Sequence, residues 1–381
     1  MKKPETRLIH PEKPTDPMYH AVVPPVYRAT TYHHADPWNP PPFDYARSGN
    51  PTRQLLEDAL AEAEMGVRGL AFSSGMSAIT AVFLLFSQGD HLIVTRDCQG
   101  GTQRALRGVF SRLGISATYV DTDNLAAVQE ALTPATKAIF VENFSNPFLR
   151  VTDIQAVASW AHRHQLLTIV DNTFITPYLQ KPLQLGADAV VHSASKMLAG
   201  HSDVTAGVIV AGSPELAQRL YFVQNACGLA LSPDDSYLVY RGLKTLALRM
   251  EQAQTSAMAL AAALQQVPGV VEVYFPGLKE HPGHDTALRS VGGFGAMVTF
   301  RLESAELVRS MVSRLQFTAV GAGFGGAETS ISLPELHCHA ALTADERRER
   351  EIGSDIVRVS LGLEHTDDIV DEFVAAIHPT R

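Results

Sequence analysis

The alternation of short apolar runs with amphipathic segments is the feature that most constrains the fold of this chain. Between residues 91 and 212, six β-rich runs are separated by segments with helical periodicity. The runs are HLIVT, SATYVD, KAIFVEN, LLTIVDN, ADAVVHSA and AGVIVAG. Continuous apolar strands that alternate with helices are typical of a parallel sheet covered by helices on both faces. The pattern therefore predicts an α/β domain, which we place at residues 52–235.

Two regions of different character flank this domain. The first region is residues 1–51, of which the first fifty contain ten prolines and several aromatic side chains, with little helical periodicity. Such a segment is expected to form an extended arm that lies on another surface, such as that of a neighbouring subunit. At the other end, a long helical stretch over 235–266 precedes the runs VVEVYF, FGAMVTFRL and DIVRVSLGL and two further helical segments. This order predicts a smaller α+β domain at 236–381 with a mostly antiparallel sheet.

Composition excludes several classes of protein. The formal net charge of −9 argues against a broad nucleic-acid or anionic-membrane surface. No apolar run reaches the roughly 18 residues needed to span a bilayer, and the N-terminal residues lack the apolar segment of a secretory signal. Three cysteines without a C-x-x-C pair favour neither a disulfide framework nor a thiolate zinc site. We therefore expect a soluble, cytoplasmic protein with no nucleic-acid or membrane partner.

A glycine motif in the C-terminal part is consistent with a dinucleotide site. Gly321, Gly323 and Gly326 match G-x-G-x-x-G after a strand-like run. The motif binds a pyrophosphate only where a helix begins directly after it. The residues that follow have no helical stripe and include a proline. A glycine-rich turn is the favoured interpretation.

Two histidine pairs are candidates for a metal site. His162 and His164 lie on a predicted helix, where residues two apart face different directions. His337 and His339 lie in a loop, where Cys338 is expected to point elsewhere. No carboxylate spacing supports either pair, so no metal site is predicted.

Three features at predicted strand ends favour a covalent aldehyde cofactor. Ser74 precedes an apolar helix whose first amides, near Gly75 and Met76, would bind a phosphate. Asp171 ends one buried run, and Lys196 follows the next. Each feature also has a structural explanation as a turn, a helix cap or a solvated lysine. Together and in this order, they supply the phosphate, pyridine and aldehyde contacts that pyridoxal phosphate requires.

The motifs of the chain resemble those of a known family. The segments YARSGNPT, SSGMSAI, GGTQR, SNP, VDNT, HSASKMLAGHSD, GGAET and VRVSLGLE occur in the order of the pyridoxal-phosphate-dependent transsulfuration enzymes. This group includes the cystathionine synthases, cystathionine lyases and methionine γ-lyases. The resemblance covers nearly the whole chain. It implies an aspartate-aminotransferase-like fold (fold type I) and a homotetramer built from two active dimers.

The resemblance also implies roles for individual residues. Lys196 would carry the cofactor and move protons at the substrate. Asp171 would hold the pyridine nitrogen protonated. Tyr45 and Arg47 would reach the cofactor phosphate of the neighbouring subunit. The complete implied cofactor-binding set is Tyr45, Arg47, Ser74, Gly75, Met76, Gln99, Asp171, Thr173, Ser193, Ser195 and Lys196. Arg358 would bind the substrate α-carboxylate, supported by Asn146 and Ser360.

Several positions depart from the family near the substrate. The stretch 142–147 reads ENFSNP where the family usually resembles E-T/S-P-x-N-P, and three single residues differ as well. Gln99 stands where the family usually has a tyrosine stacked over the cofactor ring, and glutamine neither stacks in that way nor ionises. Gly323 replaces a serine expected near the substrate carboxylate. Ala322 stands where enzymes that act on cystathionine by γ-chemistry often carry a glutamate, which weakens the case for cystathionine as a γ-substrate.

These observations lead to one principal hypothesis and two alternatives. The principal hypothesis is a pyridoxal-phosphate-dependent carbon–sulfur lyase that acts by β- or γ-elimination on cystathionine, cysteine or methionine. The first alternative is a cystathionine γ-synthase or O-acylhomoserine sulfhydrylase, which replaces a γ-substituent. The second is a catalytically impaired member of the family that serves as a binding or regulatory subunit.

Overall fold

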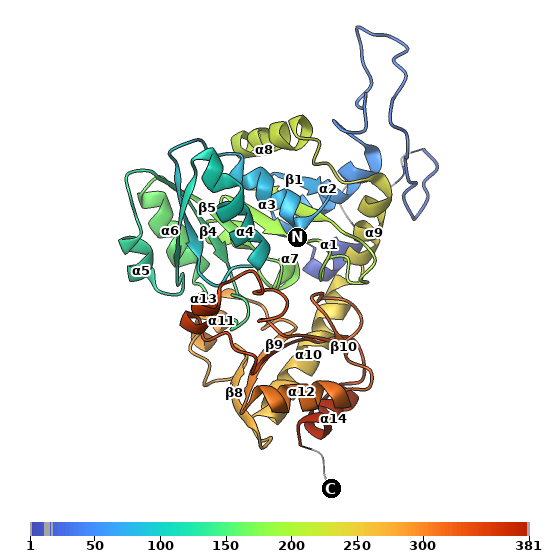
Figure 1. Ribbon diagram of the computed structural model, residues 1–381. Coiled ribbons are helices and arrows are strands. Elements are labelled where there is room, and N and C mark those ends of the chain that lie inside the picture. The colour runs from blue at the N-terminus through green and yellow to red at the C-terminus, as the bar shows by residue number, and fades with distance from the viewer. Residues whose placement is uncertain (1, 11–15, 17, 379–381) are drawn as a thin grey trace.

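The larger sheet of the computed structural model has seven strands, and the structure describes residues 2–10, 16 and 18–378 (Figure 1). The strands are β1 (Arg68–Phe72), β2 (His91–Thr95), β3 (Ser116–Val120), β4 (Thr136–Glu142), β5 (Leu167–Asp171), β6 (Ala189–His192) and β7 (Gly207–Ala211). Their order is β1-β7-β6-β5-β4-β2-β3. Strands β2 to β6 pair in parallel, whereas β7 runs antiparallel to both of its neighbours. The prediction of a mostly parallel sheet is confirmed.

All six predicted runs form strands of this sheet, and β1 is an additional strand. Its sequence, RGLAF, begins with an arginine and contains a glycine, so it lacks the continuous β-branched pattern of the other strands. Antiparallel pairing with β7 places four of its five residues in the core. Tertiary packing therefore decides the conformation of a segment whose local signal is weak.

Helices cover the two faces of the large sheet (Figure 1). They are α2 (Pro51–Glu64), α3 (Gly75–Phe83), α4 (Gly100–Gly108), α5 (Leu125–Glu130), α6 (Ile154–Arg163), α7 (Thr176–Leu179) and α8 (Pro214–Ala226), with short 3₁₀ turns η1 (Phe110–Leu113) and η2 (Pro182–Leu185). Helix α2 begins as its sequence indicates, because the Asn50 side chain accepts hydrogen bonds from the amides of Thr52 and Arg53. Among the described residues, no helix is both long and apolar enough to cross a bilayer.

A second sheet of five strands follows in the C-terminal part. Its order is β10 (Ala319–Val320), β11 (Ser330–Ser332), β12 (Ile356–Ser360), β9 (Met297–Leu302) and β8 (Val270–Tyr274). All neighbours except β10 and β11 pair antiparallel, as predicted. The accompanying helices are α10 (Leu246–Leu264), α11 (His284–Ser290), α12 (Ala305–Arg314), α13 (Ala344–Glu349) and α14 (Thr366–Ile377).

The predicted helical stretch over 235–266 is two helices, α9 (Pro233–Leu243) and α10. Arg249 of α10 stabilises the break, because its guanidinium donates hydrogen bonds to the carbonyl oxygens of Gly242, Met197 and Leu198. Helix α9 packs against α2 of the large sheet. The predicted boundary at 235/236 falls inside α9, so the domain limits of 52–235 and 236–381 stay a prediction.

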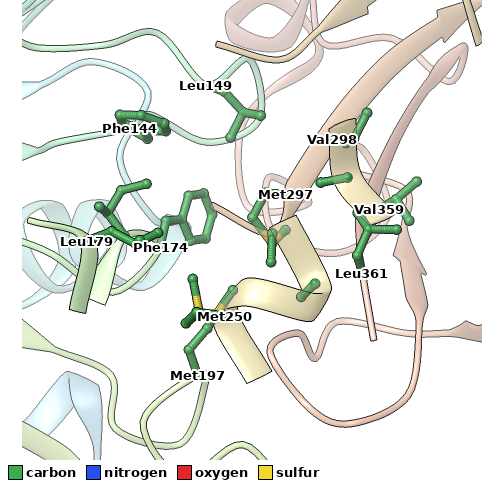
Figure 2. Close-up of a cluster of buried hydrophobic side chains, with 14 of the residues drawn as sticks. Phe144, Leu149, Phe174, Leu179, Met197, Met250, Met297, Val298, Val359 and Leu361 are labelled. Atoms are coloured by element: carbon green, nitrogen blue, oxygen red, sulfur yellow. The ribbon is translucent and has the colours of Figure 1, made fainter. Parts of the chain in front are cut away.

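One apolar cluster joins the two sheets (Figure 2). Phe144, Phe174 and Leu179 come from the large-sheet side, and Met297 and Val359 come from the small sheet. Each of these side chains is at least nine-tenths buried. Burial of apolar area stabilises by about 25 cal/mol per Å², so this cluster holds the two sheets in a defined relation. The fixed relation of the two sheets also fixes the shape of the cavity that lies between them.

The N-terminal arm is extended over most of its described length, with one exception. A short helix, α1 (Pro4–Ile9), packs against α2 and α10, whereas an extended arm was predicted there. Leu8 is buried at this contact, which explains the helix. Residues 18–50 then project beside α9 (Figure 1), and Trp38 remains 91% exposed. Residues 1, 11–15 and 17 of the predicted arm, including three of its prolines, lie outside the described residues.

Gly242 provides a test of the packing between α9 and the turn after β6. A Cβ atom at this position would clash with the carbonyl oxygen of Ala199. We expect Gly242→Ala to lower the free energy of unfolding by about 1–3 kcal/mol, measured by denaturant unfolding. The matched control is Gly108→Ala, also in a helix, where a Cβ would meet nothing within 4 Å. Equal unfolding midpoints for the two variants would contradict this account.

Candidate active site

A cavity of about 400 Å³ lies where the carboxyl edge of the large sheet meets the small sheet. Parallel strands collect ligands at this edge, because the loops that follow them converge there. Eleven of the predicted site residues line the cavity: Ser74, Gly75, Met76, Gln99, Asn146, Asp171, Thr173, Ser193, Ser195, Lys196 and Arg358.

One end of the cavity is suited to an anion. Ser74 caps α3 with its hydroxyl, which accepts a hydrogen bond from the amide of Ser77. The amides of Gly75 and Met76 belong to the first turn of α3, which has no intrahelical acceptors for its N–H groups. A Cβ at Gly75 would lie 2.8 Å from Cβ of Ser193, and a Cβ at Gly207 would clash with the Ser74 carbonyl oxygen. Two glycines thus allow the close approach of three backbone segments at this end.

Asp171 ends β5 as a buried carboxyl that faces the cavity. Its Oδ1 accepts hydrogen bonds from Thr173, at 3.0 Å from the amide and 2.5 Å from Oγ1. The Oγ1 of Thr173 in turn accepts a hydrogen bond from the amide of Ser193. Burial raises the pKa of Asp171, while the two bonds from Thr173 act to lower it. These bonds fix one oxygen in place and hold the ends of β5 and β6 together.

Lys196 lies in the turn that follows β6. Hydrogen bonds from its amide to Ser193 and from the amide of Gly200 to its carbonyl oxygen form the turn. Burial lowers the pKa of Lys196, and the positive charge of Arg358 lowers it further. A lysine in this environment loses its proton more readily than a solvated lysine, which makes it a better nucleophile and base.

Arg358 enters the cavity from β12 of the small sheet and is 2% exposed. Its Nη1 donates a hydrogen bond of 2.7 Å to Oδ1 of Asn146. Cys338 Sγ lies 3.8 Å from the same guanidinium nitrogen. The expectation that Cys338 points elsewhere is therefore wrong: the turn at 333–342 directs its side chain into the cavity. A buried guanidinium at a cavity wall is suited to binding a carboxylate.

Phe324 is the principal cavity residue that the sequence did not indicate as a site residue. Its ring centroid lies 4.6 Å from Nζ of Lys196 and 5.1 Å from Cζ of Arg358. The ring also packs edge-on against Phe174. Both cations gain from the negative face of the ring. In the sequence, Phe324 is only the residue that follows Gly323 within the glycine motif, and its residue type alone does not show that it contacts both cations.

Gln99 and Glu142 form another wall of the cavity. The Gln99 side chain caps α4 by accepting a hydrogen bond from Thr102, and the Gln99 amide donates a hydrogen bond of 2.5 Å to Glu142 Oε1. Burial and the neighbouring Asp171 raise the pKa of Glu142 well above its usual range. Glu142 was not among the predicted site residues, because a glutamate at a strand end has no distinctive pattern.

Three predicted site residues do not line this cavity. Ser360 is buried beneath it and accepts a hydrogen bond from the amide of Gly325, so it supports the loop that carries Phe324. Tyr45 and Arg47 lie on the N-terminal arm, where Arg47 donates hydrogen bonds to Asn225 of the same chain. Their predicted role requires a second subunit and stays a prediction.

The glycine motif of the C-terminal part forms a turn, as favoured from the sequence. No helix begins after Gly326; the next element is strand β11. His162 lies on α6 and approaches Asp188 at the protein surface, at 3.3 Å. His162 therefore lies outside the cavity, whereas the turn of the glycine motif contributes Ala322 and Phe324 to its wall, and His337 forms another part of that wall.

The chain shows close similarity to known enzymes over its whole length. It matches the family of Cys/Met metabolism PLP-dependent enzymes over residues 5–378. It is 43% identical to a cystathionine gamma-lyase of Bacillus subtilis over 377 residues, which is 99% of each chain. It is 44% identical to the cystathionine beta-lyase MetC of the same organism over 373 residues, which cover 98% of this chain and 96% of that one.

A solved structure shares the fold closely. The cystathionine gamma synthase of Xanthomonas oryzae pv. oryzae, in complex with aminoacrylate and cysteine, superimposes with a TM-score of 0.96 at 40% identity. The match covers 99% of this chain and 98% of that one. The aspartate-aminotransferase-like fold expected from the resemblance is confirmed by these neighbours and by the two sheets described above. The chain belongs to the pyridoxal-phosphate-dependent enzymes of cysteine and methionine metabolism.

Proposed function

We propose that this enzyme is a carbon–sulfur lyase that eliminates the β- or γ-substituent of a sulfur-containing amino acid such as cystathionine, cysteine or methionine. The observation that carries the proposal is the placement of Lys196 and Arg358 against the same aromatic ring in one cavity. An amino acid presents its amine and carboxylate on one carbon. A lysine that exchanges with the amine and an arginine that binds the carboxylate must therefore lie close together.

The cavity residues fit pyridoxal phosphate. The amides of Gly75 and Met76 would bind the phosphate, since no side chain projects from Gly75 or Gly207 to block them. Thr173 holds one oxygen of Asp171, so the carboxylate is oriented to accept a proton shared with the ring nitrogen. Ser193 would add a hydroxyl near the phosphate. When bound, the cofactor supplies an electron sink for charge that develops at the substrate Cα.

The residues of the chain supply binding and proton transfer. Arg358, held by Asn146, would grip the α-carboxylate through charge-assisted hydrogen bonds and thereby orient Cα. Lys196, neutral once released, would take the Cα proton, because burial and Arg358 lower its pKa. Phe174 and Phe324 form an apolar wall that would exclude water from the reacting carbon. Elimination of the sulfur substituent then leaves a product that hydrolyses to a 2-oxoacid and ammonia.

A second candidate is γ-replacement, as in a cystathionine γ-synthase or an O-acylhomoserine sulfhydrylase. One observation favours it. A second cavity of about 270 Å³ adjoins the first and shares Arg104 and Cys338 with it. This space would accommodate a second substrate, which replacement needs and elimination does not. The close similarity to a synthase structure is consistent with this candidate. A catalytically impaired member of the family is the third possibility.

The N-terminal arm supports the proposal of a homotetramer made of two active dimers. Tyr19 and Trp38 on the arm are 77% and 91% exposed. Large aromatic side chains in contact with water favour a second chain as their partner. In that assembly, Tyr45 and Arg47 would approach the phosphate site of the neighbouring subunit. The proposed location in the cytoplasm rests on the sequence alone.

The central experiment is a substrate panel with identified products. The panel contains cystathionine, cysteine, methionine, homocysteine and O-acylhomoserines, each with and without an added thiol. We expect a 2-oxoacid and ammonia from a single sulfur-containing substrate, measured by chromatography and an ammonia assay. A thioether that forms only when O-acylhomoserine and thiol are both present would instead establish γ-replacement. Cofactor binding without turnover of any substrate would establish the impaired member.

Replacement of the proposed cofactor-carrying lysine tests the site directly. We expect Lys196→Ala to lose the visible absorbance of the lysine-linked cofactor and at least about 10³-fold in kcat, because no other group can take its place. Lys244→Ala is the control, since Lys244 lies against Tyr240 on another surface. Full turnover and an unchanged spectrum in Lys196→Ala would refute the assignment.

The influence of Arg358 on Lys196 predicts a pH effect that does not depend on turnover. The positive charge of Arg358 lowers the pKa of Lys196, so its removal raises that pKa. Only the neutral amine attacks the aldehyde. In Arg358→Gln, the rate of cofactor capture by the apoenzyme should therefore reach its plateau at higher pH than in the wild type, measured by stopped-flow absorbance. Arg104→Gln is the matched control, because Arg104 lines the same cavity and is not among the causes of the shift at Lys196. Identical pH profiles for wild type and Arg358→Gln would contradict this coupling.

A further inference from the structure

Cys338 places a thiol on the wall of the cavity, and the roles proposed above do not use it. Of the three cysteines, Cys98 is fully buried and Cys227 is exposed, whereas Cys338 is partly exposed and lines the cavity. The turn at 333–342 packs closely on the start of α4, where a Cβ at Gly100 would clash with the carbonyl oxygen of Cys338. The thiol is therefore both accessible from the cavity and held in position.

The groups in contact with the thiol differ in charge. Sγ of Cys338 lies 3.8 Å from Nη1 of Arg358 and 3.1 Å from Nδ1 of His339. Burial, together with the positive charges of Arg358 and Arg350, lowers the pKa of His339 to about 3, so its imidazole is neutral at physiological pH. The thiol thus has a cation on one side and an uncharged hydrogen-bond partner on the other. Reactive cysteines are typically found in such electropositive, partly exposed positions.

The guanidinium beside the thiol gives a second, independent sign that this place receives an anion. Arg358 is 2% exposed and lines the cavity, yet its buried Nε has no hydrogen-bond partner among the described residues. A buried N–H group of this kind is costly to leave unpaired. A carboxylate in the cavity would supply the acceptor. That carboxylate would also lie near the sulfur, since Nη1 of the same side chain is 3.8 Å from Sγ of Cys338.

These contacts define the chemical class of the molecule that reacts there. In cysteine and its disulfide, two carbon atoms separate the sulfur from the carboxylate carbon. A carboxylate held by Arg358 would therefore bring a disulfide sulfur next to Sγ of Cys338, and proximity of this kind accelerates a bimolecular step. The proposed substrates and products include thiols of amino acids, whose oxidised forms are disulfides that carry the same carboxylate.

We propose that Cys338 is a modification site that forms a mixed disulfide with small disulfides bearing a carboxylate, such as cystine, and that Arg358 selects them by binding the carboxylate. The thiol gives its proton to solvent, and Sγ bonds to one sulfur of the disulfide. The S–S bond of the disulfide breaks, and the other sulfur leaves as a thiolate with the electron pair. Cys338 is oxidised and the small disulfide is reduced. The adduct occupies the cavity and blocks the substrate.

The inference rests on the proposed binding of carboxylates by Arg358 and is independent of whether the reaction is elimination or replacement. Its test compares two disulfides on the holoenzyme. Dithiodipropionate carries the carboxylates of cystine but no amine, so it cannot exchange with the cofactor-bound lysine. Hydroxyethyl disulfide is an uncharged control of similar length. Peptide mass spectrometry measures the rate of adduct formation at each cysteine.

We expect dithiodipropionate to be preferred over hydroxyethyl disulfide at Cys338. The ratio of the two rates should be at least about tenfold higher at Cys338 than at the exposed Cys227, because Arg358 raises the local concentration of the carboxylate reagent. Activity should fall in step with the adduct at Cys338 and return after reduction with a phosphine. An equal ratio of rates at the two cysteines in the wild type would overturn the inference.

Variants identify the group that selects the reagent. The preference at Cys338 should disappear in Arg358→Gln and remain in Arg104→Gln, because Arg104 lines the same cavity and no contact between it and the sulfur atom is found among the described residues. These adducts are measured by mass, so the result does not depend on turnover. Cys338→Ser should lose no activity with time in dithiodipropionate, whereas Cys227→Ser should be inactivated like the wild type. A preference lost in Arg104→Gln and kept in Arg358→Gln would overturn the assignment.

A separate measurement distinguishes failure of the inference from failure of the proposed function. Methylthiopropionate has the same carboxylate but no disulfide, and calorimetry measures its binding to the wild-type and Arg358→Gln holoenzymes. Tighter binding to the wild type without a preference at Cys338 would overturn the inference and leave the role of Arg358 intact. Equal binding to both would overturn both. If Arg358→Gln does not fold, the comparison of the two disulfides on the wild type decides the inference.

Discussion

The parallel register of β4, β5 and β6 is the constraint on which the site depends. Backbone hydrogen bonds place Glu142 beside Asp171, and Asp171 beside Val191. The ends of these strands must therefore share one edge of the sheet. Thr173 then joins β5 to the turn after β6 through its bonds to Asp171 and the Ser193 amide. Slippage of one residue between these strands would turn Asp171 away from the cavity and bring Asn172 into it.

Several ionisable side chains lie together in the cavity, and burial by itself favours the uncharged form of each. Burial raises the pKa of Asp171 and Glu142 and lowers that of Lys196. The apolar cluster between the sheets creates this environment by excluding water behind the cavity (Figure 2). Each charge then depends on a specific neighbour, such as Asn146 for Arg358. In a site of this kind, small changes in the surrounding residues alter reactivity strongly, because the interactions are weakly screened.

The elements with strong local signals were predicted from the sequence, and those formed by packing were not. Six apolar runs predicted six strands, since β-branched residues in short runs have few alternatives. Strand β1 and helix α1 were missed because their burial comes from distant partners. The break between α9 and α10 was missed for a similar reason. Arg249 donates hydrogen bonds both to the carbonyl oxygen of Gly242 and to that of Met197, which lies far away in the sequence. The sequence pattern of residues 235–266 contains no sign of a contact with Met197.

The residues of the candidate site also fall into those that local motifs predicted and those that only packing placed there. Residues in compact motifs at strand ends, such as Ser74, Asp171 and Lys196, could be proposed together because topology brings such ends to one edge. Phe324 and Cys338 lie in turns of the C-terminal part, where no periodicity indicates which way a side chain points. Both side chains line the cavity, so the expectation that Cys338 points elsewhere was wrong. The Glu64–His192 pair joins residues 128 positions apart, a contact that no local pattern contains.

The amino-acid sequence by itself determined the α/β architecture, the family and the residues at the carboxyl edge of the sheet. It could do so because hydrophobic periodicity and motif order are local properties of the chain. Only the tertiary structure decided which side chains of the C-terminal part lie against Lys196, which buried side chain pairs with His192, and how large the cavity is. These features depend on distances between segments far apart in the chain. Such distances are set by the packing of the two sheets across their common core.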